Sequence, residues 1–89
     1  MGRLDDFYAR RSLVVQLLRE SPITSPKVLA SIDVLLGAGE EVEAFDMLCS
    51  WIYEDELPIA REYYARIVAA ADMLGTPGSA ERLDELLID

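Results

Sequence analysis

The sequence predicts an all-α fold, a compact bundle of four main helices plus a short C-terminal helix, in one domain spanning residues 1–89. Three observations predict it. Apolar residues recur at three- and four-residue spacing through successive segments. Prolines and glycines separate these segments, and no stretch alternates apolar and polar residues as a half-buried strand does. A chain of 89 residues can bury only a small core, so we expect modest stability.

The first expected helix covers residues 4–20. Its apolar side consists of Leu4, Phe7, Tyr8, Val14, Val15 and Leu18. Arg11 falls on this side, and two interpretations are open. Its aliphatic stem packs on the core while the guanidinium stays in water, or the guanidinium forms a partly buried ion pair with an acid of another helix.

The second expected helix covers residues 26–37 and follows the helix-breaking segment SPITSP at 21–26. Ser25 is a good N-cap, and Pro26 suits the first helical position. The glycines at positions 37 and 39 end the helix. Its buried side consists of Val28, Leu29, Ile32, Leu35 and Leu36.

The third expected helix covers residues 40–55. Its first turn holds three glutamates, which complement the positive end of the helix dipole. It ends before Pro58, because proline disfavours helical geometry in the residue that precedes it. Its core face, at helical spacing, consists of Val42, Phe45, Leu48, Cys49 and Ile52.

A fourth helix is expected over 59–74, with Gly75 ending it. Its apolar stripe consists of Ile59, Tyr63, Ile67, Ala70 and Leu74. A fifth is expected over 79–88, after the turn sequence TPGS. Ten residues are too few for a stable isolated helix, so its leucines should dock on the bundle. These are Leu83, Leu86 and Leu87.

The charge of the chain concentrates on the third helix. The net charge is −9, and residues 39–57 contain seven carboxylates and no basic residue. This helix therefore lacks the i,i+4 ion pairs that usually offset repulsion between like charges. A solvated acidic face is one interpretation. The other is a binding face, because methionine and tryptophan beside unpaired charge resemble binding hot spots. The candidate partner-binding residues are Glu40, Glu43, Asp46, Met47, Ser50, Trp51, Glu54 and Asp55.

Two interpretations of Trp51 are open. On a helical wheel it lies on the side of the third helix opposite the core arc. It is therefore either an exposed anchor for a partner or a residue that packs against the first or fifth helix.

Composition excludes several kinds of site. The chain has no histidine and one cysteine, so a Ser-His or Cys-His catalytic pair cannot form within it. A zinc site is not expected, and the acids at 54–56 lack the spacing of a calcium loop. No phosphate-binding glycine loop is present. We therefore expect no enzyme activity, no cofactor and no metal.

Charge and hydropathy also bound the partners and the location. The acidic balance disfavours direct binding to nucleic acid, because phosphate contacts need lysine and arginine. It favours a basic protein partner. No apolar run approaches the roughly 20 residues that span a bilayer, and the first residues match neither a signal peptide nor a myristoylation pattern. With its single cysteine, the chain is expected to be cytoplasmic, without a membrane partner.

Residues 39–75 also carry a family resemblance. The pattern runs GE, an alanine, LC, a tryptophan and an acid, then LPI, YY and MLG. It consists of Gly39, Glu40, Ala44, Leu48, Cys49, Trp51, Ile52, Glu54, Leu57, Pro58, Ile59, Tyr63, Tyr64, Ile67, Met73, Leu74 and Gly75. This run resembles small all-helical immunity proteins of bacterial polymorphic-toxin systems, namely Maf-type and contact-dependent growth-inhibition immunity proteins.

The resemblance implies a protein that binds and neutralises a cognate toxin domain in the cytoplasm of the producing cell. Toxins of this group are often nucleases, and an acidic helix would then act on a basic toxin surface. The alternative is an acidic helical adaptor or an antitoxin-like regulatory subunit. The chain is expected to be a monomer or a weak homodimer, with Val34, Val68 and Trp51 as candidate dimer contacts.

Overall fold

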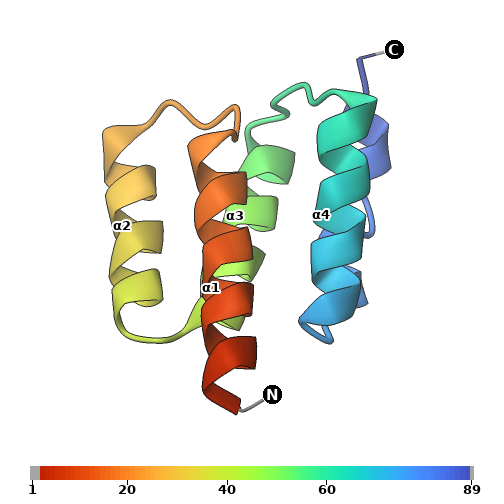
Figure 1. Cartoon of the computed structure of the whole chain (residues 1–89). Coiled ribbons are helices and arrows are strands. Elements are labelled where there is room, and N and C mark those ends of the chain that lie inside the picture. The colour runs from red at the N-terminus through yellow and green to blue at the C-terminus, as the bar shows by residue number, and fades with distance from the viewer. Residues whose placement is uncertain (1–2, 89) are drawn as a thin grey trace.

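The structure, a computed structural model, describes residues 3–88 and is an all-α bundle (Figure 1). It confirms the predicted fold class, with four main helices and a short helical segment at the C-terminus. The four α-helices are α1 (Arg3–Arg19), α2 (Pro26–Gly37), α3 (Glu41–Glu54) and α4 (Arg61–Met73). The C-terminal segment consists of two 3-10 turns, η1 (Pro77–Ala80) and η2 (Leu83–Leu86).

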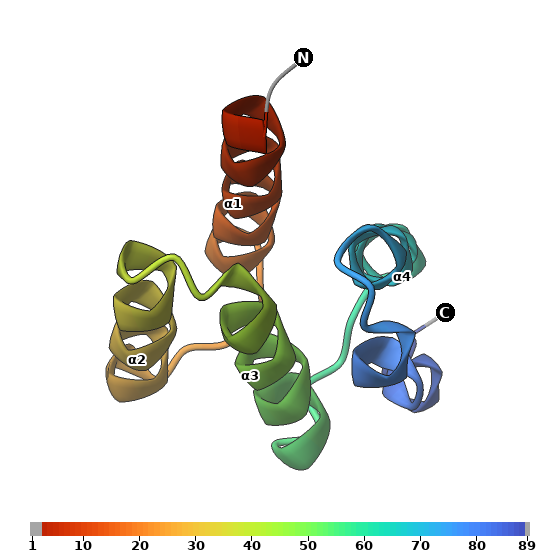
Figure 2. The ribbon, with the colours of Figure 1, turned by 90° about the horizontal axis from the view of Figure 1, so that it is seen from below.

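Helix α3 lies at the centre of the bundle. Viewed from below, α1, α2 and the group formed by α4 with the C-terminal turns surround it on three sides (Figure 2). It contacts α1, α2, η1 and η2 directly. The fourth side of α3 is left toward solvent, so one helix supplies both the middle of the core and a part of the surface.

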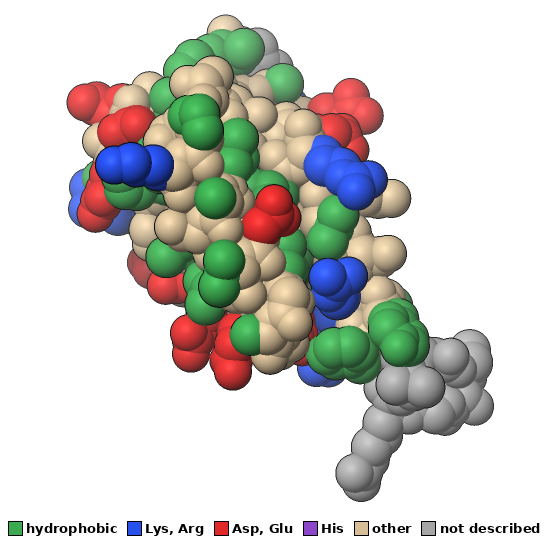
Figure 3. Space-filling model, turned by 90° about the vertical axis from the view of Figure 1, so that its left-hand side faces the viewer, with side chains coloured by type: hydrophobic (Ala, Val, Ile, Leu, Met, Phe, Trp, Pro, Cys, Tyr) green, Lys and Arg blue, Asp and Glu red, His purple; other side chains and the backbone are tan. Residues whose placement is uncertain are grey.

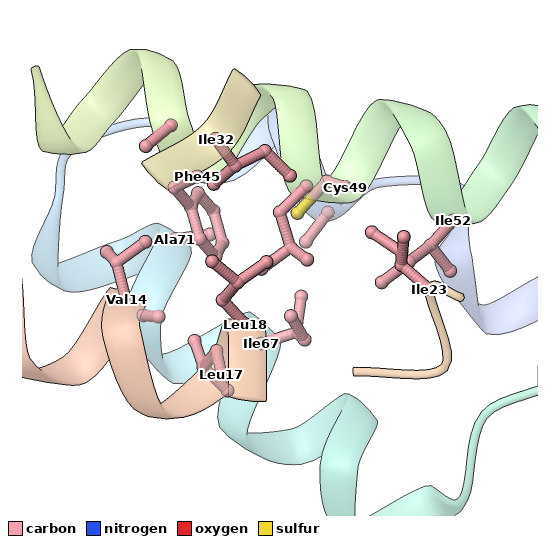
Figure 4. Packing of buried hydrophobic residues seen from close by; sticks show 14 of the residues in the cluster. Val14, Leu17, Leu18, Ile23, Ile32, Phe45, Cys49, Ile52, Ile67 and Ala71 are labelled. Atoms are coloured by element: carbon pink, nitrogen blue, oxygen red, sulfur yellow. The ribbon is translucent and has the colours of Figure 1, made fainter. Parts of the chain in front are cut away.

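The core forms where these elements meet (Figure 4). Val14 and Leu17 of α1 point toward Phe45 of α3 and toward Ile67 of α4, and each of these four side chains is fully buried. A hydrogen bond of 2.6 Å from the Tyr63 hydroxyl to the Leu17 carbonyl joins α4 to the end of α1. That carbonyl is one of the last four of its helix, which intrahelical bonds leave unpaired.

Helices α2, α3 and α4 end with the same Schellman motif. In each one a residue with positive φ follows the C-cap, and the next N–H bonds back to the carbonyl five residues earlier. At the end of α2 this residue is Gly39 (φ 79°), and at the end of α4 it is Gly75 (φ 74°). At the end of α3 it is Glu56 (φ 50°), followed by a Leu57 N–H to Ile52 carbonyl bond of 3.0 Å. The sequence predicts the glycines after α2 and α4 and, from Pro58, the end of α3, but it does not predict a glutamate at positive φ after α3.

The start of α2 also agrees with the sequence. The Ser25 hydroxyl oxygen accepts a 3.4 Å hydrogen bond from the N–H of Val28, and Pro26 occupies the first helical position. Arg11 fits neither of its two interpretations in full. It is half-buried, and its Nε donates a 3.2 Å hydrogen bond to the Leu36 carbonyl at the end of α2. The cation thus meets the negative end of a helix dipole, not an acidic side chain.

The prediction of burial is wrong for two residues, Tyr8 and Val42. Tyr8 is 58% exposed, while Leu17, which the pattern missed, is fully buried. In α3, Val42 is 40% exposed and Ala44 is fully buried. The reason is tertiary. Helix α2 packs against the side of α3 that carries Ala44, which extends the buried arc in that direction and leaves Val42 beyond its other edge.

The last expected elements start and end at different residues. Helix α4 begins at Arg61, because Ile59 instead forms an isolated parallel bridge with Leu87. The Ile59 N–H donates a hydrogen bond of 3.1 Å to the Leu86 carbonyl, and the Ile59 carbonyl accepts one of 3.2 Å from the Ile88 N–H. This pairing extends the chain at Leu87, so the C-terminal segment forms two 3-10 turns in place of one continuous helix. Leu83 is nevertheless buried, and Leu86 and Leu87 pack against the core as expected.

Candidate protein-binding face of the third helix

Helix α3 divides its side chains sharply between core and solvent. Its buried face consists of Ala44, Phe45, Leu48, Cys49 and Ile52. The opposite face exposes the carboxylates of Glu43 and Asp46, the hydroxyl of Ser50 and the side chain of Met47, which is 36% exposed. These four are among the residues that the sequence predicts for partner binding, and the structure brings them together.

The four residues line one surface hollow of about 580 Å³, here called the acidic hollow. Helix α3 forms its floor. Leu35 of α2 borders it on one side, and Thr76, which precedes η1, borders it on the other. Val42 also lines it, which accounts for the exposure of that side chain. The hollow therefore combines two carboxylates with an apolar surface supplied by two helices.

A second hollow of about 270 Å³, here called the tryptophan hollow, adjoins the first through Met47. Its other lining residues are Lys27, Val28 and Ser31 of α2, with Trp51 of α3. Trp51 is half-buried and packs at the margin of the core. In this hollow it lies with Val28 of α2.

Asp46 has a structural partner that the sequence did not reveal. One of its carboxylate oxygens accepts a 2.9 Å hydrogen bond from the Ser79 hydroxyl in η1. The Ser79 and Thr76 hydroxyls are 2.7 Å apart and share a further hydrogen bond. Asp46 therefore holds η1 beside α3 as well as facing solvent. No local pattern predicts this contact, since the two residues are 33 positions apart.

The remaining predicted residues lie away from the acidic hollow. Glu40 is the N-cap of α3 and Asp55 its C-cap, at opposite ends of the helix. Glu54 lines a separate hollow of about 320 Å³ with Glu56 and Glu85. The eight predicted residues therefore form a central group with outlying acids at both ends, and not one continuous stripe.

Two arginines of the described residues, Arg66 and Arg82, pair with acids outside the acidic hollow. Arg66 of α4 makes two bonds of 2.7 and 3.1 Å to the carboxylate of Glu20, and this hydrogen bonding lowers the pKa of Glu20. Arg82 pairs with Glu85 at 3.2 Å, and its guanidinium lies 4.8 Å from the centre of the Tyr53 ring. Neither pair includes a carboxylate of the acidic hollow.

The C-terminal end of α3 has unfavourable electrostatics. Glu54, Asp55 and Glu56 follow one another where the helix dipole is already negative, and the last turn contains no basic residue. These acids reduce the stability of the helix end, while they add to the negative potential that a basic partner would meet.

The other reactive groups belong to the core. Cys49 is buried, and desolvation raises the pKa of its thiol to about 12, so it stays protonated at neutral pH. Among the described residues, no group of three or more potential ligand side chains is placed to hold a metal ion. Within the same residues, no helix combines the length and the apolar content needed to cross a bilayer.

Comparison with known proteins does not assign the chain: no protein-family model, curated protein or solved structure matches it. The resemblance of residues 39–75 to immunity proteins therefore stays a prediction. The structure shows an acidic and partly apolar surface, on which the carboxylates of Glu43 and Asp46 lie beside the side chain of Met47.

Proposed function

We propose that this protein is a stoichiometric inhibitor of the immunity-protein kind, which binds the basic surface of a bacterial toxin domain through the exposed face of α3. One observation carries the proposal. Glu43, Asp46, Met47 and Ser50 line a single hollow on a helix that contains no lysine or arginine. The carboxylates form no ion pair within the helix and lie beside an exposed apolar side chain. Such a surface suits a partner that supplies basic residues and an apolar contact.

The chain would inhibit its partner by covering part of the partner's surface, without catalysing a reaction. The carboxylates of the acidic hollow accelerate encounter with a basic partner and fix its orientation. Met47 and Trp51 supply apolar contact area, which slows dissociation. A toxin domain that cuts nucleic acid has a basic groove for phosphates. In such a groove, the carboxylates of Glu43 and Asp46 would take the place of two phosphates and keep the substrate out.

The test is neutralisation of a toxin. The proposal predicts that an adjacent gene encodes a large secreted protein with a C-terminal toxin domain. The chain is co-expressed with that domain, and growth of the host is measured. We expect wild-type protein to restore growth and to form a 1:1 complex with that domain. Failure to bind or to restore growth would reject the toxin-inhibitor function and leave the alternative, an acidic adaptor or antitoxin-like subunit.

A charge reversal locates the binding face. Glu43→Lys is the preferred variant, because Asp46 also holds Ser79 and its replacement would disturb the fold. Asp72→Lys is the matched control, since it makes the same change in net charge at an exposed position of α4. We expect Glu43→Lys to slow association and to reduce its salt dependence, and Asp72→Lys to have a much smaller effect. Equal effects would show that only net charge matters.

A further inference from the structure

We infer that the element of the partner that binds this face is an amphipathic α-helix with basic residues along one margin. The inference rests on the proposed function, that α3 presents a protein-binding face, and it specifies what the face accepts. The receiving surface is the α2–α3 groove, which we define by the apolar residues that line the two hollows between these helices. These are Val28 and Leu35 of α2 with Met47 and Trp51 of α3.

The groove is elongated along α3. The acidic and tryptophan hollows adjoin at Met47, which lines both, and together they extend from Glu43 to Trp51. These two positions are eight residues apart on a helix, which corresponds to about 12 Å. A partner helix of two to three turns has the length to fill this distance. A single side chain or a small polar ligand would occupy only one of the two hollows.

The composition of the groove suits the apolar face of a helix. Leu35 and Val28 approach it from α2, and Met47 lies between them at the junction of the two hollows. Along a partner helix, residues i+4 and i+7 lie about 6 and 10 Å from residue i. The three residues can therefore contact Leu35, Met47 and the Trp51 end in turn. This is the spacing of helix-in-groove recognition, in which apolar anchors enter a channel between helices.

Charge selects the kind of helix. Glu43 and Asp46 border one end of the groove, and Lys27 borders the other end. A partner helix with lysine or arginine beside the two carboxylates gains ion pairs at the margin of an apolar contact. A helix with acidic flanks would be repelled. In Figure 3, which looks onto the side of α2, hydrophobic side chains run down the surface and several acidic side chains gather at the lower left.

Trp51 provides the readout, because it is the single tryptophan of the chain and lies in the groove. The probe is a tryptophan-free amphipathic peptide of about 16 residues, since shorter isolated helices are marginal in water. It has leucines at i, i+4, i+7 and i+11 and lysines along one margin. A scrambled peptide of identical composition removes the apolar stripe. A third peptide has glutamate in place of lysine.

We expect the amphipathic lysine peptide to shift the Trp51 emission to shorter wavelength in a saturable manner, because a seated helix removes the indole from water. The scrambled and the glutamate peptides should bind at least about tenfold more weakly, which corresponds to about 1.4 kcal/mol. Equal binding of the scrambled peptide would overturn the inference, because it would show attraction to net charge alone. Absence of any saturable shift would overturn it as well.

A pair of methionine variants tests the location without any change of charge. Met47→Ala removes the side chain shared by the two hollows. Met73→Ala makes the same chemical change on α4, where Met73 is 55% exposed. We expect Met47→Ala to weaken the peptide about tenfold and Met73→Ala to leave its affinity within about twofold of wild type. Equal affinities of the two variants would place the binding site elsewhere.

The same variants separate the inference from the proposed function. If the toxin domain is neutralised equally by wild type and Met47→Ala but poorly by Glu43→Lys, the function stands and the helix-in-groove mode is wrong. If the peptide occupies the groove but the toxin domain is not neutralised, the groove stands and its partner is a different basic protein.

Discussion

Glu56 is the position at which the structure predicts that a substitution stabilises the protein. It occupies the positive-φ position after α3, with φ of 50°, where α2 and α4 have glycine. For a residue with a Cβ, the left-handed conformation is less stable than its preferred conformations by about 1–2 kcal/mol. Glu56 also adds a carboxylate where the α3 dipole is negative, which is unfavourable by about 0.3–1 kcal/mol when exposed.

The replacement Glu56→Gly removes both costs. It also increases the conformational entropy of the unfolded chain, which offsets about 0.5–1 kcal/mol of the gain. The difference is a net stabilisation of about 1 kcal/mol. For a domain of this size it corresponds to a rise in Tm of about 4–8 °C. The hydrogen bonds of the Schellman motif are made by main-chain groups and are kept by the variant.

Urea unfolding monitored by Trp51 fluorescence measures the free energy of unfolding of each variant. Glu56→Gln isolates the charge effect, so it should recover only the smaller part of the gain. Gly75→Ala is the converse control, since it introduces a Cβ at φ of 74°, and should destabilise by about 1 kcal/mol. A loss of stability in Glu56→Gly, or an equal gain in Glu56→Gln, would show that backbone strain at this position is not the dominant cost.

Two further predictions concern contacts between helices. Tyr63→Phe should lower the free energy of unfolding by about 1–3 kcal/mol, because the Leu17 carbonyl loses its 2.6 Å partner while buried; Tyr64→Phe is the control in the same denaturation assay. The Glu20–Arg66 pair should make stability depend on pH, since the pKa of Glu20 is lowered from its ordinary 4.5 by the Arg66 hydrogen bond. The contribution of the pair to the free energy of unfolding is fully present above the ordinary pKa of glutamate. It is lost as the pH falls through the lowered pKa that Glu20 has in the folded protein. The difference in urea midpoint between wild type and Glu20→Gln should therefore vanish in acid, and a difference that persists there would contradict the pairing.

Local signals predict most of the helices. Ser25 with Pro26 marks the start of α2, and Gly39 and Gly75 mark two of the helix ends. Each of these signals works through neighbouring backbone atoms, so a short stretch of sequence contains all the information needed. The positive φ of Glu56, two residues after α3, is less predictable, because glutamate has no preference for positive φ.

Part of the candidate site could also be predicted. Helical spacing alone separates Glu43 and Asp46 from the core face of α3, and the structure places both in the acidic hollow with Met47. The hydrogen bond from Ser79 to Asp46 could not be predicted, because it depends on how the C-terminal turns pack. The separation of Glu54 from this group depends on the same packing.

Local sequence patterns predict the helical class, the main helix boundaries and the concentration of negative charge on α3. These follow from periodicity, capping and composition, which are local properties. The burial of Ala44, the exposure of Val42 and the groove between α2 and α3 depend instead on how the helices pack together. The reason is that one helix has several possible buried arcs of similar width, and the direction from which α2 approaches selects among them.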